Sequence, residues 1–215
     1  MSVVPFSAAL RERTWNHHAD SEGARFMADL MKGAGTREDY IALVAQHYFV
    51  YDALESAATV FADDPEVAPF LSPALTRMPA IESDLEFLLG ADWRDRIAPL
   101  PTAVRYADRI ATIAAERWGG GFVAHHYTRY LGDLSGGQHI RKLMQRQFGF
   151  DTNGVGFYLF DEIADPSAFK HHYRDELDAA GWDDAERERV IDEVLQAYRL
   201  NTELFDDLAA AKAAA

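Results

Sequence analysis

The eight histidines are the residues of this chain best suited to hold a metal, because the sequence contains no cysteine. The absence of cysteine excludes disulfides, zinc–thiolate sites, cysteine-ligated iron–sulfur clusters and a cysteine nucleophile. A di-iron helical bundle needs a glutamate three residues before a histidine, and no histidine here has an acidic residue at that position. An HExxH zinc motif is also missing. A single helical histidine could still serve as the axial ligand of a heme iron.

His18 is the best candidate for that ligand, because Glu22 follows it by one helical turn. A carboxylate at this spacing can accept the second ring N–H and fix the tautomer. His17 is a rival ligand, but it has no glutamate four residues later, and adjacent residues on a helix point about 100° apart. The alternative is that His18 is an ordinary structural histidine.

A cluster of glycines breaks the helical pattern of the segment 122–148. Gly132, Gly136 and Gly137 lie within six positions, and each glycine inside a helix costs about 0.5–1 kcal/mol relative to alanine. Either the helix is kinked there, or something approaches its backbone more closely than a Cβ atom would allow. A tight helix–helix crossing and a flat ligand on that face are both consistent with this pattern. Arg129 and Asp133, four residues apart beside the glycines, could form an ion pair.

The elements that would position these residues are helical almost throughout. Hydrophobic spacing predicts about eight helices in one all-α domain over residues 1–215, with an ordered core over about 7–209 and an alanine-rich tail. We expect Ser7 to cap the first helix, Thr36 to open a capping box, and Pro166 to lie in the first turn of a late helix. We expect one helix to end at the run Gly119–Gly121. The piece 155–160 is expected to be a loop.

The charge balance is strongly acidic, with 21 basic and 35 acidic residues giving 21 − 35 = −14. Such a chain is a poor non-specific partner for nucleic acid or for an anionic membrane. No apolar run approaches the roughly 18 residues that span a bilayer, and no secretory leader is evident. We therefore expect no membrane anchor and a cytoplasmic location. An anionic ligand would need a local cluster of basic residues.

The run from Tyr127 to Gln138, YTRYLGDLSGGQ, resembles the distal-helix signature of the heme oxygenases. Four further stretches are similar to parts of that family, so the resemblance covers roughly residues 8–209. They are Thr14, His18, Glu22 and Phe26-Met27 on the proximal helix; Tyr51 to Glu55; Phe169-Lys170 with Tyr173-Arg174; and Asn201 with Leu204-Phe205.

The resemblance implies an all-α fold in which heme b, both substrate and cofactor, is sandwiched between a proximal and a kinked distal helix. It implies oxygen-dependent cleavage of heme, expected at the α-meso carbon, to biliverdin, ferrous iron and carbon monoxide. The electrons would come from an external reductase or a ferredoxin-type donor, because the chain carries no GxGxxG fingerprint after a strand.

The resemblance also implies roles for individual residues. His18 would bind the iron, with Glu22 as its hydrogen-bond partner. Asp133 would hold a proton-delivering water network with Arg129 and Tyr51, beside the closely approaching Gly132, Gly136 and Gly137. The remaining residues would contact the propionates or the pocket wall: Arg11, Tyr127, Lys170, Arg174, Tyr198 and Asn201. Arg11 stands where lysine is common in the family, and Tyr198 where an apolar aromatic is frequent.

Two rival functions remain at this point. A non-catalytic heme carrier would share His18 and the basic residues but would not need Asp133 and Arg129 beside the glycines. A heme-free enzyme on the same fold is disfavoured, because thiaminase-type relatives need a cysteine. Iron acquisition, heme detoxification and bilin supply would all use the same enzyme.

Overall fold

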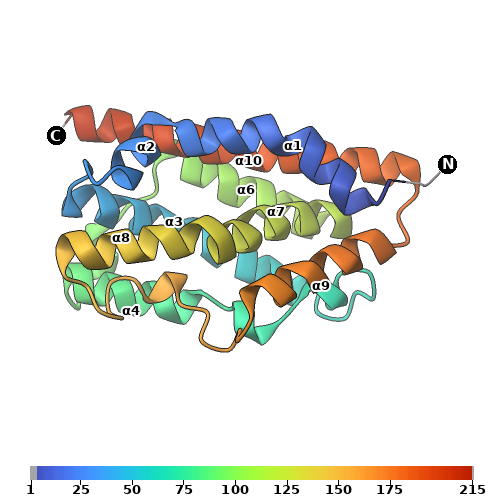
Figure 1. Cartoon of the computed structure of the whole chain (residues 1–215), viewed down its shortest axis with the longest axis horizontal. Helices are drawn as coiled ribbons and strands as arrows, with labels where there is room; N and C mark the ends of the chain where they lie inside the picture. Colours follow the sequence, from blue (N-terminus) through green and yellow to red (C-terminus); the bar gives the residue numbers. More distant parts are fainter. Residues whose placement is uncertain (1–3, 215) are drawn as a thin grey trace.

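The computed structural model describes residues 4–214, apart from the side chain of Glu22, and these residues form helices and loops without a β-strand. Figure 1 shows the long helices running side by side, with α1 lying along α10. The helices are α1 (Phe6–Gly23), α2 (Arg25–Met31), α3 (Arg37–Val60), α4 (Met78–Leu89), α5 (Trp93–Arg96), α6 (Pro101–Ala115), α7 (Gly119–Gly132), α8 (Gln138–Phe148), α9 (Pro166–Ala179) and α10 (Asp184–Ala214). A π-helical turn (Asp133–Gly137) joins α7 to α8, and single 3₁₀ turns occupy Ala68–Phe70, Pro73–Leu75 and Gly156–Tyr158. The all-α prediction is confirmed.

Local sequence signals define two of the helix starts as predicted. The Thr36 hydroxyl accepts a hydrogen bond from the Asp39 N–H at 3.1 Å, and the Asp39 carboxylate accepts one from the Thr36 N–H at 2.7 Å. This capping box satisfies backbone donors that α3 itself cannot pair. At α9, the Asp165 carboxylate accepts hydrogen bonds from two backbone N–H groups, and Pro166 occupies the first turn.

Two predicted helix ends are wrong. Ser7 does not cap α1, because α1 begins one residue earlier. The Ser7 N–H and hydroxyl instead donate to the Asp178 carboxylate at 2.7 and 2.9 Å, which ties α1 to α9.

The helix expected to end at Gly119–Gly121 ends at Ala115, because Arg117 adopts a left-handed φ of 51°. The glycines instead form the first turn of α7. A Cβ atom on Gly120 would lie 2.8 Å from Val190 Cγ2 of α10, so glycine permits close packing there.

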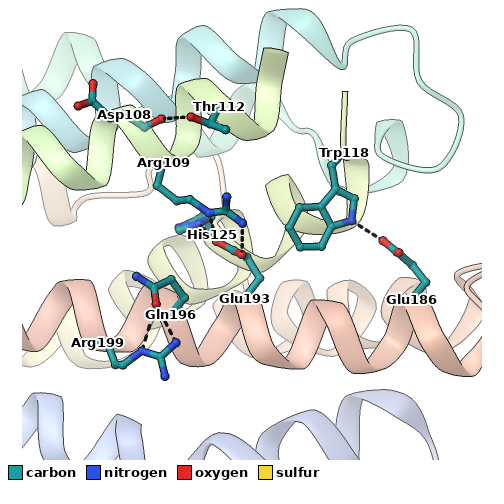
Figure 2. A network of polar contacts seen from close by, with 9 residues as sticks. All are labelled: Asp108, Arg109, Thr112, Trp118, His125, Glu186, Glu193, Gln196 and Arg199. Atoms are coloured by element: carbon teal, nitrogen blue, oxygen red, sulfur yellow. Dashed lines mark hydrogen bonds and ion pairs between the residues drawn. The ribbon is translucent and has the colours of Figure 1, made fainter. Parts of the chain in front are cut away.

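One continuous core of buried apolar side chains runs between the helices, and a partly buried ionic cluster links three of the helices around it. Figure 2 shows the Arg109 guanidinium of α6 donating two hydrogen bonds to the Glu193 carboxylate of α10, at 2.9 and 2.5 Å. The His125 ring of α7 lies 2.8 Å from the same carboxylate. This cluster fixes α7 against α6 and α10 and thereby places the residues that follow α7. No helix within residues 4–214 is long and apolar enough to cross a bilayer.

Candidate functional site

A cavity of about 1010 Å³ opens between α1 and α2 on one side and α7 with the π-helical turn on the other. Its volume is at the upper end of the range typical of small-molecule and cofactor sites. Most of the predicted site residues line it: Arg11, His18, Tyr127, Arg129, Gly132, Asp133, Gly136, Gly137, Arg174, Tyr198 and Asn201. The fold therefore brings together residues that are nearly 200 positions apart in the sequence.

His18 lies on the α1 wall of the cavity, and His17 does not line the cavity. The His18 ring is stacked against the Trp15 ring, with centroids 5.6 Å apart and an interplanar angle of 14°. The Tyr198 ring of α10 meets it edge-on at 5.7 Å and 81°. Of the two adjacent histidines, His18 is therefore the one placed to bind a ligand in this cavity. The side chain of Glu22 lies outside the described residues, so its pairing with His18 stays a prediction.

The opposite wall is the irregular segment that the glycine cluster predicted. The helix is widened to a π-helical turn over Asp133–Gly137, a distortion that is frequent at functional sites. A Cβ atom on Gly132 would meet no atom within 4 Å, so this position faces open space rather than a neighbouring helix. Gly137 differs, because a Cβ atom there would lie 2.6 Å from Cδ1 of Tyr158. Close packing against Tyr158 thus explains Gly137, whereas Gly132 leaves room for a ligand.

Asp133 and Arg129 are both buried at this wall, but they do not form the ion pair that their spacing suggested. Within the described residues, the Asp133 carboxylate accepts a hydrogen bond from the Tyr51 hydroxyl of α3. The Arg129 guanidinium donates to Asn201 Oδ1 of α10 at 3.0 Å and lies 5.0 Å from the centroid of the Tyr51 ring. Tyr51 is therefore a supporting residue behind the wall, and it does not line the cavity.

Burial sets the acid–base properties of this group. It raises the pKa of the Asp133 carboxyl, and the Arg129 guanidinium and the Tyr51 hydrogen bond only partly offset that increase. Burial acts to lower the pKa of Arg129, but Tyr51 and Asp133 favour the charged form and hold it above its ordinary value. The wall thus combines a permanent positive charge with a carboxyl group that accepts and releases a proton closer to neutral pH than usual.

Basic residues gather at one end of the cavity. Arg11 of α1 and Arg174 of α9 line it beside Tyr127 of α7. Burial raises the pKa of Tyr127, and the two arginines partly oppose that effect, so its hydroxyl remains protonated. Lys170, which was expected to contact a propionate, does not itself line the cavity. Its ammonium group donates to the Ser135 hydroxyl at 2.9 Å. Because Ser135 lines the cavity, Lys170 stands just behind the rim.

The remaining histidines lie where packing or solvent accounts for them. His126 is buried and its Nδ1 lies 2.9 Å from the Tyr173 hydroxyl, while His171 and His172 are exposed. His47 is buried against the Phe157 ring, and burial together with Arg129 holds its pKa far below the ordinary value, so it is neutral. None of these side chains lines the cavity.

The sequence analysis missed several wall residues, of which Trp15 is the largest exposed one. Its side chain is 53% exposed and lines the cavity. The signal was its spacing, since it stands four residues after Arg11 and three before His18. Met27, Met31, Ile140 and Phe205 also line the cavity, and their apolar periodicity alone marks them only as packing residues.

The donor set fits a flat, dianionic metal macrocycle rather than a bare metal ion. No group of three or more histidines and carboxylates gathers within the described residues. A macrocycle that supplies its own equatorial nitrogen ligands needs only one protein imidazole, an open face such as that at Gly132, and cations for its carboxylates.

Comparison with known proteins agrees with this geometry. The heme oxygenase family profile matches residues 4–207. Heme oxygenase 1 of Synechocystis is 37% identical over 205 residues, covering 95% of this chain and 85% of that protein. Human heme oxygenase 1 is 38% identical, covering 94% of this chain and 71% of that protein. The crystal structure of Synechocystis heme oxygenase-1 in complex with heme superimposes with a TM-score of 0.91 at 36% identity, over 97% of this chain and 94% of that one.

Proposed function

The chain belongs to the heme oxygenase family, and on that premise we propose that it cleaves heme in the cavity between α1 and the π-helical turn. It is an oxidoreductase that degrades heme, and the products are biliverdin, ferrous iron and carbon monoxide. One observation carries the assignment of the site: His18 and the open backbone face of Gly132 line opposite walls of the same cavity.

His18 is the proposed iron ligand, and Glu22 its proposed hydrogen-bond partner. Bound heme supplies the iron that activates dioxygen and the meso carbon that becomes oxidised. The protein supplies one imidazole from α1 and a glycine-bearing wall on the far side. The missing side chain at Gly132 lets the backbone of α7 approach the ligand face.

Asp133 is proposed to hold the water network that delivers a proton at the reacting face. It is the only carboxylic acid among the described residues that line the cavity. The Tyr51 hydroxyl holds its carboxylate in place, while Asn201 holds the Arg129 guanidinium. A heme carrier would gain nothing from a buried acid and a buried cation at this wall, and both are costly to desolvate. The buried Asp133 and Arg129 therefore favour a heme-degrading enzyme over a heme carrier.

Arg11, Arg174 and Tyr127 are the proposed partners of the propionates, with Lys170 behind them. Their clustering at one end of the cavity would orient the macrocycle and so present one meso carbon to the distal wall. We expect that carbon to be the α one. We propose that an external reductase or a ferredoxin-type donor supplies the electrons.

The proposed function also implies a domain organisation, a source of electrons and a cellular location. We propose that residues 1–215 act as one domain and that electrons come from a separate protein. A cytoplasmic location, expected from the sequence, belongs to this proposal because heme degradation needs a supply of reductant.

A single-turnover assay tests the proposal. The protein is loaded with one equivalent of hemin and given ascorbate in air, with catalase present. We expect the Soret band to disappear and biliverdin to be extractable. His18→Ala should lose this reaction, whereas His17→Ala, at the adjacent position outside the cavity, should retain it. A wild-type protein that binds hemin but keeps its Soret band would be a carrier, and one that does not bind hemin would retain only the fold of this family.

A further inference from the structure

We propose that Trp15 positions the His18 imidazole for iron ligation and forms part of the ligand-contact surface. This inference rests on the proposed function, because it assumes that His18 binds iron. It adds a residue that neither composition nor motif singled out.

The geometry around His18 is that of a ring held on two sides. Trp15 precedes His18 by three residues, so the two side chains share one face of α1. Their rings are nearly parallel, at 14°, with centroids 5.6 Å apart. Tyr198 approaches edge-on from α10 at 5.7 Å. Rotation of the imidazole about its Cβ–Cγ bond would have to displace one of these aromatic rings. Together the two rings therefore fix the orientation of the imidazole plane.

The exposure of Trp15 points to a ligand as well as to a structural role. Its side chain is 53% exposed, although burying an aromatic side chain of this size is strongly favourable. The other large apolar side chains that are exposed within residues 4–214 are Val4, Val60, Phe87 and Val104, and none of them lines the cavity. Trp15 alone in this group stands where a bound macrocycle would cover it.

Arg11 restrains the indole in turn. Its guanidinium carbon lies 5.9 Å from the centroid of the Trp15 ring, within the range of a cation–π contact. Arg11, Trp15 and His18 therefore form a row along α1, at spacings of four and three residues. The row connects the basic end of the cavity to His18. The Trp15 indole would therefore lie between Arg11, which binds the heme carboxylates, and His18, which binds the iron.

A residue that orients a metal ligand typically changes metal affinity about 10–100-fold when it is removed. We therefore expect Trp15→Ala to bind hemin about tenfold more weakly, and Trp15→Phe to remain within about threefold of the wild type, because a phenyl ring still stacks. The matched control is Phe87→Ala. Phe87 is 50% exposed on α4, away from the cavity, and its removal should leave hemin affinity unchanged.

The first measurement uses the heme-free protein. Histidine ring protons are observed by NMR in protein labelled at histidine, and His18 is assigned by its loss in His18→Ala. The stacked indole should shift the His18 ring protons upfield. Trp15→Ala should abolish that shift, and Trp15→Phe should keep most of it. An unchanged His18 resonance in Trp15→Ala would overturn the stacking on which the proposal depends.

The second measurement uses the hemin complex reduced to the ferrous state without oxygen, and its iron–histidine stretching frequency by resonance Raman spectroscopy. We expect this band to shift or broaden in Trp15→Ala, to recover in Trp15→Phe and to stay unchanged in Phe87→Ala. Identical bands and hemin affinities in wild type and Trp15→Ala would overturn the role of Trp15 alone. Failure of the wild type to bind hemin would overturn the proposed function and this role with it.

Discussion

The Tyr51 hydroxyl on α3 donates a hydrogen bond to the Asp133 carboxylate at the start of the π-helical turn. The two residues are 82 positions apart and both are buried. This contact connects a core helix to the cavity wall, so the orientation of the Asp133 carboxyl group depends on how α3 packs against α7. It also explains why a residue outside the cavity can influence chemistry inside it.

Asp133→Asn should separate catalysis from binding. Asparagine keeps the shape of the side chain but lacks the carboxyl group that is proposed to hold the proton-delivering water network. Positioned acid–base groups contribute about 10²–10⁴-fold to a rate, and we expect biliverdin formation to fall by at least tenfold with hemin affinity nearly unchanged. Single-turnover spectra and hemin titration measure the two quantities, with exposed Asp175→Asn as a control. An undiminished biliverdin yield would contradict the assignment of Asp133.

Tyr51→Phe should cost stability and activity together, whereas Tyr40→Phe should cost stability alone. Each change removes a buried hydroxyl, and the Tyr40 hydroxyl donates to the Gly154 carbonyl oxygen at 2.7 Å, away from the cavity. Leaving a buried acceptor unpaired costs about 1–3 kcal/mol. Urea unfolding of the heme-free proteins should show a loss in both variants, and turnover should fall only in Tyr51→Phe. Equal turnover in the two variants would remove Tyr51 from the site.

Substitution of the glycines should have opposite effects at two nearby positions. Gly132→Ala adds a methyl group into open space, so the heme-free protein should gain about 0.5–1 kcal/mol from helix propensity while hemin binding weakens. Gly137→Ala should instead destabilise the protein, because its Cβ would press on the Tyr158 ring. Thermal unfolding and hemin titration decide between these outcomes. A Gly132→Ala protein that binds hemin as tightly as wild type would argue that no ligand approaches this backbone.

The buried Glu193 should make stability fall in acid. Burial acts to raise its pKa, but Arg109 and His125 together outweigh that effect and lower the pKa from 4.5 to about 2. A carboxyl group whose folded pKa is depressed stabilises the fold above its unfolded pKa, and that contribution is lost as pH falls from about 4.5 toward 2. Glu193→Gln should therefore be less stable than wild type at pH 7, and the difference should shrink on acidification. A difference that is independent of pH would exclude this linkage.

The sequence by itself determined the properties that depend on neighbours along the chain. The capping box at Thr36 and the proline at the start of α9 follow from local hydrogen bonding, and both are present. The glycine cluster marked the distortion at 133–137 because its helix-propensity cost is local. His18 was distinguished from the other histidines by Glu22 one helical turn later, and the resemblance to the heme oxygenases supplied its predicted role as the iron ligand.

Only the tertiary structure decided which long-range partner each polar group takes. The spacing of Arg129 and Asp133 suggested a pair, but Arg129 binds Asn201, 72 residues away, and Asp133 binds Tyr51. Likewise, Lys170 donates to Ser135 and does not itself line the cavity, and the Tyr198 ring reaches the His18 ring from α10. Helix periodicity determines which side chains share a face, whereas the partner across that face depends on how helices distant in sequence pack together.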